Sequence, residues 1–415
     1  MNIIKTVELD LCVSCEICSS ACPENAISMR LLRGQFLPEV NENQCNMCGI
    51  CLEVCPGIDI YTLDLMEEDN FMDIIKQNSI ECFSGFCKDN QIRKLSTSGG
   101  LITKLIIELI KNREFDAAFV LKFHKPNDSP VRLTISNDIG EIIKSAGSKY
   151  IPASVYNVIE TLKVKDEKKY IIVGTSCQIL GIKKFMRKNK ISDKNLLFLG
   201  LFCDATLNLN FLKFIKELYA KSTEKTEEFF FRTKEKYGWP GHSKIVFNSG
   251  RSLILDRMIR ISLKKYFNLN RCLFCFDKLN RLSDISFGDC YIQKTQNKEG
   301  SSNIIIRTSK GKEIIDSFAS IFDLKEEKLI KILLSQNIMK KYKNFLYARL
   351  LAKNKSLFPI KVKSYKVSYL DRIKLKVFQY YLGLGQNYKC TRILIDFLFR
   401  KLMNKLNLFL KYVIK

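Results

Sequence analysis

The feature that most constrains this 415-residue chain is a run of four cysteines that occurs twice near its start. The stretch CVSCEICSSACP begins at Cys12, and the stretch CNMCGICLEVCP begins at Cys45. In both runs the cysteines are separated by two, two and three residues, and a proline follows the last one. In a reducing compartment, cysteines clustered in this way indicate metal ligands more often than disulfides.

The duplicated spacing is the pattern of bacterial ferredoxins that hold two [4Fe-4S] clusters. Three cysteines of a run bind three irons of one cubane, and the fourth, held away by the proline, reaches the other cubane. The pattern therefore predicts two ligand sets: Cys12, Cys15, Cys18 and Cys55 for cluster 1, and Cys22, Cys45, Cys48 and Cys51 for cluster 2. Paired CxxC motifs also make zinc sites, which are the alternative.

The residues around the two runs predict the rest of a small module. Residues 26–40 favour a short helical turn and then two strands joined at Arg33 and Gly34, the usual connector of such a module. Residues 1–66 hold three basic and nine acidic side chains, a net charge of −6, so we expect an acidic ferredoxin-type domain here. Two neighbouring clusters form an electron-transfer chain, but they do not identify its acceptor.

Composition places this module in a larger protein. With 46% hydrophobic residues, the chain can form two or three domains with their own cores. No stretch approaches the roughly 18 apolar residues of a membrane span. The N-terminus lacks a basic segment followed by an apolar one, so we expect no signal peptide and a cytoplasmic location. The only histidines, His124 and His242, are interpreted as ordinary loop or strand residues.

The middle of the chain, residues 67–335, favours a mixed α/β domain. The stretch STSGG at residues 96–100 precedes a pattern of apolar residues at helical spacing, and a strand is expected at residues 117–123. The N–H groups at such a helix start can bind an anion such as phosphate. The alternative is an ordinary capped helix.

A second strand–helix unit places a cysteine where open α/β sheets bind ligands. The strand at residues 171–173 turns into a helix at Cys177, at the C-terminal edge of the strand. A further apolar strand ends in Cys203, and a CxxC pair, Cys272 and Cys275, comes later. No GxGxxG fingerprint follows these strands, which argues against a conventional dinucleotide-binding fold.

Seven motifs follow the cysteine runs in one order. They are STSGG, AGSKYIP, VGTSCQILG, GLFC, FRTKEKYGW, CLFCFDKLNRLSDISFGDCY and SSNIIIRTSKGKEII. This ordered set resembles the family of coenzyme F420 (deazaflavin) hydrogenase/dehydrogenase β subunits over residues 10–315. The resemblance implies a flavoprotein that joins FAD to iron–sulfur clusters. A single chain with its own two-cluster domain is similar to the bacterial members that lie among polysaccharide-synthesis genes.

The resemblance also implies a use for the scattered cysteines. Cys177, Cys203, Cys272 and Cys275 match family cysteines and could ligate a third [4Fe-4S] cluster beside the flavin. A structural zinc or unligated thiols are the alternatives. The chain departs from the family at Ser176, where proline is usual, and this puts the turn around Cys177 in doubt.

Flavin contacts are carried over from the family residue by residue. The resemblance implies Thr97, Ser98, Gly99 and Gly100 as phosphate contacts, Lys149 as a flavin or pyrophosphate partner, and Thr175 and Asp289 as isoalloxazine neighbours. Lys149 and Asp289 also fit as a surface charge and a turn residue. A flavin has a clear role here, because clusters pass single electrons whereas most organic substrates take a hydride or two electrons. The sequence does not identify a general acid.

The C-terminal region, residues 336–415, is strongly basic. Residues 340–415 hold nineteen basic and two acidic side chains, so their net charge of +17 is most of the total of +25. From Arg392 onward, polar residues recur every three or four positions, which predicts a basic amphipathic helix for membrane-surface binding or partner docking. The alternative is a helix packed on its own domain. No nucleic-acid-reading motif occurs, so we expect no nucleic-acid partner.

Together these features predict a multidomain α+β and α/β protein: a dicluster ferredoxin fold at 1–66, a flavin-binding domain at 67–335 and a basic helical tail at 336–415. We expect a cytoplasmic enzyme, an iron–sulfur flavin-dependent oxidoreductase, peripheral on the inner face of the membrane if the tail binds lipid. It would pass electrons from a ferredoxin-like donor through the clusters to FAD and an organic substrate, as in polysaccharide biosynthesis. The alternatives are a non-catalytic electron-transfer subunit docked on a partner enzyme or membrane, and a coenzyme F420 oxidoreductase.

Overall fold

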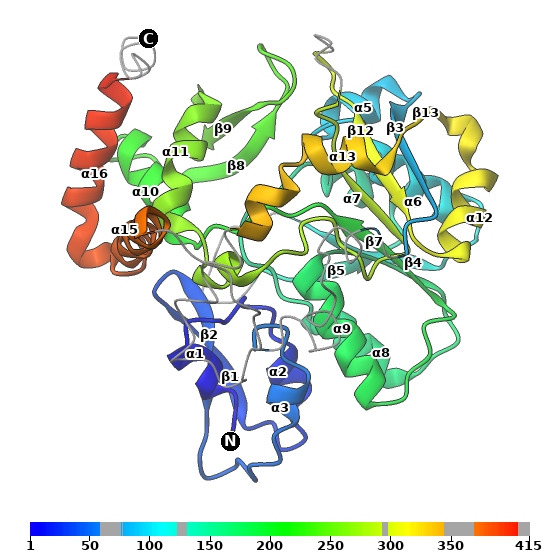
Figure 1. Ribbon diagram of the computed structural model, residues 1–415, viewed down its shortest axis with the longest axis horizontal. Coiled ribbons are helices and arrows are strands. Elements are labelled where there is room, and N and C mark those ends of the chain that lie inside the picture. Colours follow the sequence, from blue (N-terminus) through cyan, green and yellow to red (C-terminus); the bar gives the residue numbers. More distant parts are fainter. Residues whose placement is uncertain (59–75, 77, 123–130, 293–297, 344–368, 406–415) are drawn as a thin grey trace.

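The computed structural model describes residues 1–58, 76, 78–122, 131–292, 298–343 and 369–405. It consists of a small N-terminal module, a large sheet with helices, and a third, mostly helical part (Figure 1). The domain boundary expected at residue 66 lies outside the described residues.

The N-terminal module is built around an antiparallel hairpin. Its strands are β1 (Ile27–Leu32) and β2 (Gln35–Val40). Arg33 and Gly34, both with positive φ, form the two-residue turn, which confirms the hairpin expected there. Three short helices complete the module: α1 (Ile4–Glu8), α2 (Ile17–Ser20) and α3 (Ile50–Glu53).

An eight-stranded mixed sheet with the order β13-β3-β12-β11-β7-β6-β4-β5 forms the central part. Its strands are β3 (Glu81–Cys87), β4 (Ala117–Leu121), β5 (Leu133–Ser136), β6 (Tyr170–Thr175), β7 (Leu196–Leu201), β11 (Ile285–Asp289), β12 (Ser302–Ile306) and β13 (Phe322–Glu326). Four neighbours, β4, β6, β7 and β11, run parallel, and the flanking strands are bonded to their neighbours in antiparallel fashion. The three strands expected from sequence are confirmed as β4, β6 and β7. The parallel strands β6, β7 and β11 therefore end at one edge of the sheet.

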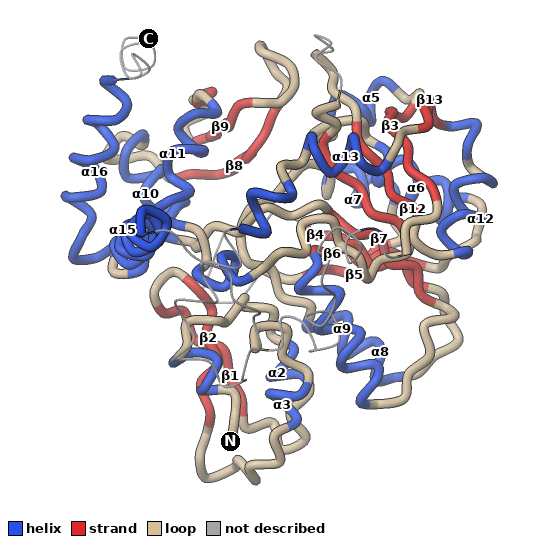
Figure 2. Tube along the Cα trace, in the orientation of Figure 1, coloured by secondary structure: helices blue, strands red, loops and turns tan. Residues whose placement is uncertain are grey.

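Helices cover both faces of this sheet (Figure 2). They are α5 (Asn90–Leu95), α6 (Leu101–Lys111), α7 (Ile139–Lys144), α8 (Tyr156–Val164), α9 (Ser176–Lys188), α12 (Ser309–Ser317) and α13 (Leu329–Ser335), with the 3-10 turns η2 (Asn270–Phe274) and η3 (Ala319–Ile321). Successive strand residues point to opposite faces, so Ile171 packs with α6 whereas Ile172 packs with α8 and α9. The sheet is thus buried on both sides, which explains its near-continuous apolar parallel strands.

The third part packs four helices on a three-stranded antiparallel sheet of order β10-β9-β8. Its elements are β8 (Thr226–Thr233), β9 (His242–Phe247), β10 (Ser252–Leu255), α10 (Asn210–Tyr219), α11 (Arg257–Phe267), α15 (Tyr369–Gln386) and α16 (Tyr388–Lys405). Aromatic rings from these elements form its core; for example, Phe211 and Phe231 stack with centroids 5.8 Å apart.

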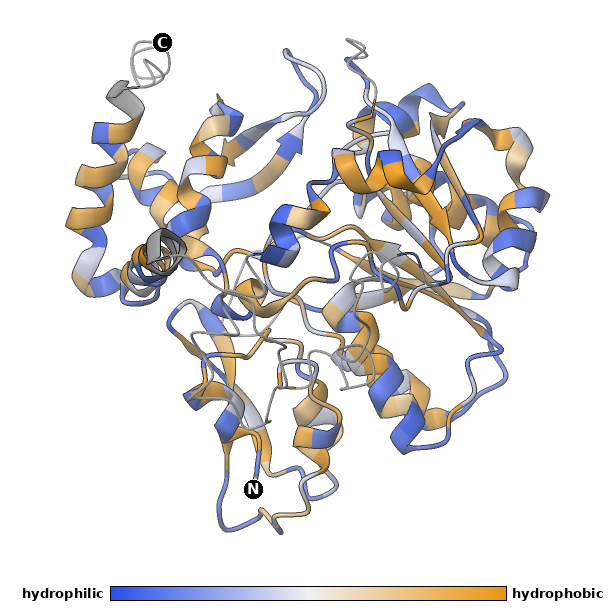
Figure 3. Cartoon of the chain, viewed as in Figure 1, coloured by the Kyte–Doolittle hydropathy of each residue, from blue (hydrophilic) through white to orange (hydrophobic). Residues whose placement is uncertain are grey.

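The basic tail contributes to this core. In α16, Ile395 and Phe399 are fully buried, whereas Ile393 is 85% and Phe397 61% exposed. The helix therefore packs on its own domain with one face and leaves other apolar side chains in solvent. Hydrophobic and hydrophilic residues alternate along it (Figure 3). The amphipathic positions expected beyond residue 405 lie outside the described residues. None of the helices described is long and apolar enough to cross a membrane.

The N-terminal module shares a hydrophobic core with helices α8 and α9. Ile17 and Val54 are fully buried among side chains of these helices and of the large sheet. A Cβ atom added to Gly181 of α9 would lie 2.3 Å from Cδ1 of Ile17 and 3.2 Å from Pro56. Only glycine therefore lets α9 approach the cysteine runs so closely.

We predict that Gly181→Val lowers the free energy of unfolding by about 2 kcal/mol, because the new side chain overpacks this contact. Gly383→Val is the matched control, since an added Cβ in helix α15 meets nothing within 4 Å. The control should change stability by less than about 0.5 kcal/mol. Urea denaturation of both anaerobically purified variants measures the difference, and equal effects would contradict tight docking at Gly181.

Candidate redox centre

The first group of cysteines lies on the buried side of the N-terminal module. Cys12, Cys15, Cys18 and Cys55 lie close enough for their thiols to interact electrostatically. Burial, with a smaller contribution from Cys55, raises the pKa of Cys12 to about 12. Two backbone N–H groups donate to sulfur at 3.3 Å, from Ser14 to Cys12 and from Gly57 to Cys55.

The second group lies nearer the surface. Cys22, Cys45, Cys48 and Cys51 line one pocket between the hairpin and the start of α3. The N–H of Ala26 donates to the sulfur of Cys22 at 3.4 Å. Cys51 also raises the pKa of Cys18, so the two groups are neighbours. The eight cysteines thus lie in two neighbouring groups of four thiols, and their assignment to two clusters stays a prediction.

No three His, Cys, Asp or Glu side chains in the described parts of the chain converge on a position for one metal ion.

A third group of cysteines assembles from three distant places in the sequence. Cys177 opens α9 after β6, Cys203 follows β7, and Cys272 and Cys275 lie in and after η2. Each of these thiols interacts electrostatically with others of the group. Cys177 and Cys203 lie at the sheet edge because they directly follow β6 and β7. The CxxC pair is held beside them because the N–H of Cys203 donates to the carbonyl of Lys278, in the loop that follows the pair.

Ser176 replaces the family proline without disturbing this turn. It is the first residue of α9, a position that proline also favours. Its hydroxyl donates to the carbonyl of Asp277 at 2.6 Å and so ties α9 to the loop after Cys275. Thr175 is already extended, with φ −78° and ψ 165°, as a residue before proline would be.

The first and third cysteine groups are neighbours. Cys177 raises the pKa of Cys15, although burial is the larger cause. The buried guanidinium of Arg271 donates to the carbonyls of Pro56 and Gly57 at 2.9 and 3.0 Å. Lys184 of α9 donates to the carbonyl of Cys55 at 3.0 Å. The three groups therefore form one series that begins in the N-terminal module and ends at the sheet edge.

A bidentate ion pair fixes the same interface from the other side. Glu16, 4% exposed and between two cysteines of the first run, accepts from Arg132 at 3.0 and 2.6 Å and from the hydroxyl of Ser154 at 2.5 Å. The N–H of Val155 donates to the carbonyl of Cys15 at 3.0 Å. These contacts bind the cysteine loops themselves to the large domain.

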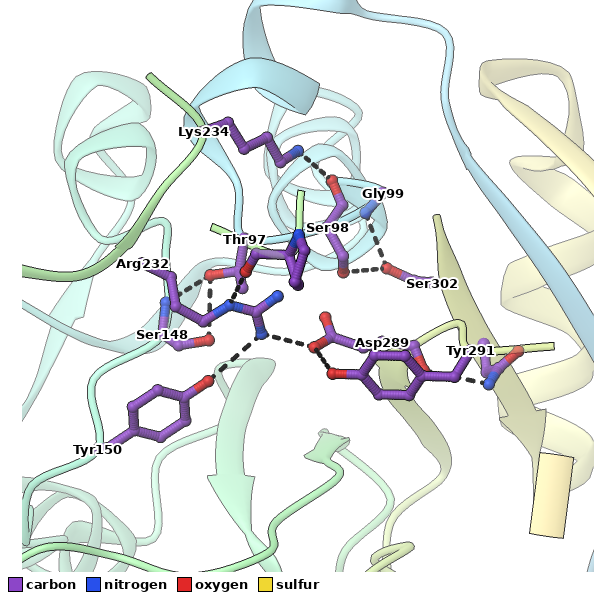
Figure 4. A network of polar contacts seen from close by, with 12 residues as sticks. Thr97, Ser98, Gly99, Ser148, Tyr150, Arg232, Lys234, Asp289, Tyr291 and Ser302 are labelled. Carbon is purple, nitrogen blue, oxygen red and sulfur yellow. Dashed lines mark hydrogen bonds and ion pairs between the residues drawn. The ribbon is translucent and has the colours of Figure 1, made fainter. Parts of the chain in front are cut away.

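The residues expected at the flavin phosphates lie together before α6 (Figure 4). The Oγ1 of Thr97 accepts from Ser148, and Ser98 and the N–H of Gly99 bond to the hydroxyl of Ser302. Gly100, rather than a serine or threonine, is the N-cap residue, and no side chain caps the helix. The expected helix is confirmed, and its start is not the ordinary side-chain-capped one that was the alternative.

Two other expected flavin contacts have internal partners. Lys149 donates to the carbonyls of Ser145, Ala146 and Gly147 at 2.6 to 3.1 Å, at the end of α7. Thr175 caps α9 through a reciprocal pair of bonds with Gln178, and its hydroxyl lies 3.4 Å from the sulfur of Cys177. Their roles as flavin contacts stay predictions.

Asp289, the last expected contact, belongs to a charged network at the end of β11. Its carboxylate pairs with Arg232 at 2.5 Å and accepts from Tyr291 at 2.9 Å. Arg232 also donates to the hydroxyl of Tyr150 at 3.3 Å, so the three side chains point toward one another (Figure 4). Tyr150 and Arg232 lie inside the motifs AGSKYIP and FRTKEKYGW, but the motifs give no signal of this network.

Tyr150 is the titratable group that sequence reasoning missed. Burial acts to raise the pKa of its phenol, but the guanidinium groups of Arg232 and Arg260 outweigh it, and the pKa is lowered. A phenol with a lowered pKa at the strand edge loses its proton more readily than an ordinary tyrosine.

This fold and these cysteine groups are those of an iron–sulfur protein. Residues 11–57 match the "4Fe-4S dicluster domain". Residues 82–160 and 167–330 match the N-terminal and C-terminal models of "Coenzyme F420 hydrogenase/dehydrogenase, beta subunit". The chain belongs to the family of coenzyme F420 hydrogenase/dehydrogenase β subunits, as its ordered motifs predict.

Relatives are similar over most of the chain. The chain is 24% identical over 331 residues to "Coenzyme F420-dependent sulfite reductase" of Methanocaldococcus jannaschii, in a match that covers 74% of this chain and 46% of that protein. It is 22% identical over 328 residues to a subunit of the F(420)H(2) dehydrogenase of Methanosarcina mazei, in a match that covers 79% and 87%. The chain thus spans about half the length of the sulfite reductase.

A solved structure has the same fold. A chain of the F420-reducing [NiFe] hydrogenase complex from Methanosarcina barkeri superposes with a TM-score of 0.50 at 20% identity. The match covers 69% of this chain and 98% of that one.

We predict that Ser176→Ala lowers the stability of the protein by about 1 kcal/mol, because one hydrogen bond is lost. Ser176→Pro loses the same bond but regains part of its effect through a stiffer unfolded chain. Thermal unfolding should therefore rank wild type above Ser176→Pro and Ser176→Pro above Ser176→Ala. A proline variant less stable than the alanine variant would show that the turn does not accept the family residue.

Proposed function

We propose that the protein is an iron–sulfur flavoenzyme that passes electrons from a ferredoxin-like donor through [4Fe-4S] clusters to FAD and on to an organic substrate. The observation that carries the proposal is the series of three cysteine groups, which leads from the exposed Cys48 to the edge where β6, β7 and β11 end. Open α/β sheets bind their ligands at such an edge.

The cluster ligands follow from the cysteine groups. Cys12, Cys15, Cys18 and Cys55 would hold cluster 1, Cys22, Cys45, Cys48 and Cys51 cluster 2, and Cys177, Cys203, Cys272 and Cys275 a third cluster. Cys22 lies with the cysteines of the second run, and Cys55 lies with those of the first run. These positions support the assignment of each to the cluster of the other run. The third set has a cation beside it, since Lys341 donates to the carbonyls of Asp204 and Cys272. A positive charge there stabilises the negative charge of a thiolate-bound cluster.

FAD fits the residues between the third group and α6. The helix α6 begins without a side-chain cap, so its first N–H groups suit a phosphate, with Thr97, Ser98, Gly99 and Gly100 around it. Thr175 and Asp289 flank the sheet edge where the isoalloxazine would lie, and Lys149 fixes the loop beside Thr97. When bound, FAD supplies the exchange between single-electron and two-electron chemistry.

The residues of this chain orient the reacting groups and donate or accept the proton. Asp289 holds the guanidinium of Arg232, and Arg232 in turn holds the hydroxyl of Tyr150. Tyr150 is the best-placed proton donor or acceptor for a substrate at this edge, because the two guanidinium groups favour its ionised form.

Two other functions have specific support. The names of the relatives from Methanocaldococcus jannaschii and Methanosarcina mazei favour coenzyme F420 as the organic partner. The relative from Methanosarcina mazei is one subunit of its dehydrogenase, which favours an electron-transfer subunit docked on a partner enzyme. A role in polysaccharide biosynthesis rests only on the similarity between this single chain, which has its own two-cluster domain, and the bacterial members that lie among polysaccharide-synthesis genes.

The tail offers a contact surface for a partner or for the inner face of a membrane. Ile393 and Phe397 are exposed on α16 beside the exposed Arg392 and Arg400. Exposed apolar side chains flanked by basic ones suit an anionic lipid surface.

We predict that the double variant Ile393→Asp/Phe397→Asp loses co-sedimentation with vesicles that contain anionic lipid. Both changes remove apolar contact and add repulsion from the lipid charge. The matched control Ile330→Asp alters an exposed apolar residue of α13 and should bind like wild type. If the wild-type protein does not bind the vesicles, the tail serves another partner.

The third cluster has a direct test. We predict that Cys275→Ser loses about four iron atoms per chain and its share of the EPR signal, because a cubane needs its thiolate ligands. Cys390→Ser is the control, since Cys390 is exposed and outside the three groups. Iron counting and EPR after anaerobic purification measure the change. Equal iron content in both variants would contradict the third ligand set.

A further inference from the structure

Arg260 is a buried cation without a partner among the described residues. It lies in the first turn of α11 and is only 8% exposed. Within the described residues it makes no hydrogen bond or ion pair, and its Nε is buried without a partner. It does contact the ring of Tyr150, whose centroid lies 5.0 Å from Cζ. A buried guanidinium is normally paired, so this one lacks a counter-charge.

The neighbouring carboxylate of Asp289 favours the charged form of Arg260 but forms its ion pair with Arg232. Arg232 is close enough to Arg260 to lower its pKa, and its own partner is Asp289. One guanidinium nitrogen of Arg232, Nη2, is also buried without a partner in the described part of the chain.

On the far side of Arg232, Lys234 donates only to the neutral carbonyls of Arg93 and Ser98, at 2.5 and 2.6 Å. The carboxylate of Glu299 pairs with Arg93 at 3.1 Å. Among the residues described here, Arg93 and Arg232 thus have carboxylate partners, whereas Arg260 and Lys234 form no ion pair.

We propose that Arg260 and the unpaired face of Arg232 form a binding site for a phosphate group, beside Tyr150. Guanidinium groups match phosphate because their N–H donors form paired hydrogen bonds with its oxygens. An anion bound there would compensate the buried charge of Arg260, which forms no ion pair among the described residues.

The site lies beside the residues that the proposed function assigns to the flavin, and its assignment to a substrate rests on that function. A phosphate could come from the pyrophosphate of FAD or from a phosphorylated substrate, such as an organic phosphate ester. Both sources present the same chemistry to Arg260. The two sources differ during purification: the pyrophosphate of FAD stays with the protein, whereas a phosphorylated substrate does not.

The buried position of these cations favours the binding of an anion beside them. Burial is the main cause that lowers the pKa of Arg260, and it lowers the pKa of Lys234 to about 8, with Arg93 and Arg232 adding to the effect. A bound phosphate would raise both pKa values, because it favours the charged forms.

The test compares Arg260→Met with Arg257→Met in the full-length protein purified anaerobically. Arg257 is exposed in the same helix, so the control removes the same charge three residues away. Titration with inorganic phosphate by calorimetry, at constant ionic strength, and extraction of bound flavin are the two readouts. We expect phosphate to bind wild type and Arg257→Met, and its affinity to fall at least about tenfold in Arg260→Met, the loss of one charged hydrogen-bond pair.

The outcomes separate the two sources. Phosphate binding that falls while flavin content is retained assigns the site to a phosphorylated substrate. Flavin content that falls together with phosphate binding, measured on flavin-stripped protein, assigns it to the cofactor.

Equal phosphate affinity and flavin content in the Arg260 and Arg257 variants would overturn the site. So would a wild-type protein that binds no phosphate either with its flavin bound or after the flavin is removed. Should Arg260→Met fail to fold by circular dichroism, Arg260→Lys keeps the charge without the paired donors and should bind with intermediate affinity. Absence of flavin from the wild type would contradict the proposed function but leave the phosphate titration valid.

Discussion

The structure depends on how the N-terminal module is attached to the large domain. Its cysteine loops are not merely adjacent to the domain: the carbonyls of Cys15 and Cys55 accept hydrogen bonds from Val155 and Lys184, and the buried Glu16 pairs with Arg132. Gly181 allows α9 to meet Ile17 at van der Waals distance. Because these contacts use the loops that carry the cysteines, any movement of the module would move its cysteines relative to Cys177. Electron transfer through a fixed series of sites requires this kind of rigid attachment.

The other end of the series is shaped by charge. The N-terminal module is acidic, whereas the strand edge beyond the third cysteine group carries buried cations, among them Arg232 and Arg260. These guanidinium groups favour ionised forms of nearby groups, including the phenol of Tyr150. One region therefore offers both an anion site and a proton donor, next to the place where electrons would arrive. The same cations are costly to bury without an anionic ligand, which ties the stability of this region to what it binds.

Local patterns predicted more of this protein than composition did. The two cysteine runs, the hairpin at Arg33 and Gly34 and the central parallel strands follow from spacing and alternation, because these features involve residues close in sequence. The third cysteine group could be proposed only from the family motifs, since its members meet through the sheet topology. Arg260 gave no signal at all, because an arginine in an amphipathic helix is ordinarily exposed. Thr175 and Lys149 differ from Arg260 because family motifs mark both positions. The motifs do not predict the internal partner that the structure gives each side chain.

In the proposed function, electrons that enter at the N-terminal cysteines reach a flavin at the strand edge. Anaerobic stopped-flow reduction of the intact protein by a reduced ferredoxin, followed at cluster and flavin absorbance, measures this transfer. The clusters should be reduced first and the flavin afterwards, and the second phase should slow sharply in Cys275→Ser. A protein without flavin absorbance, or a flavin reduced at the same rate with and without the thiol of Cys275, would contradict it.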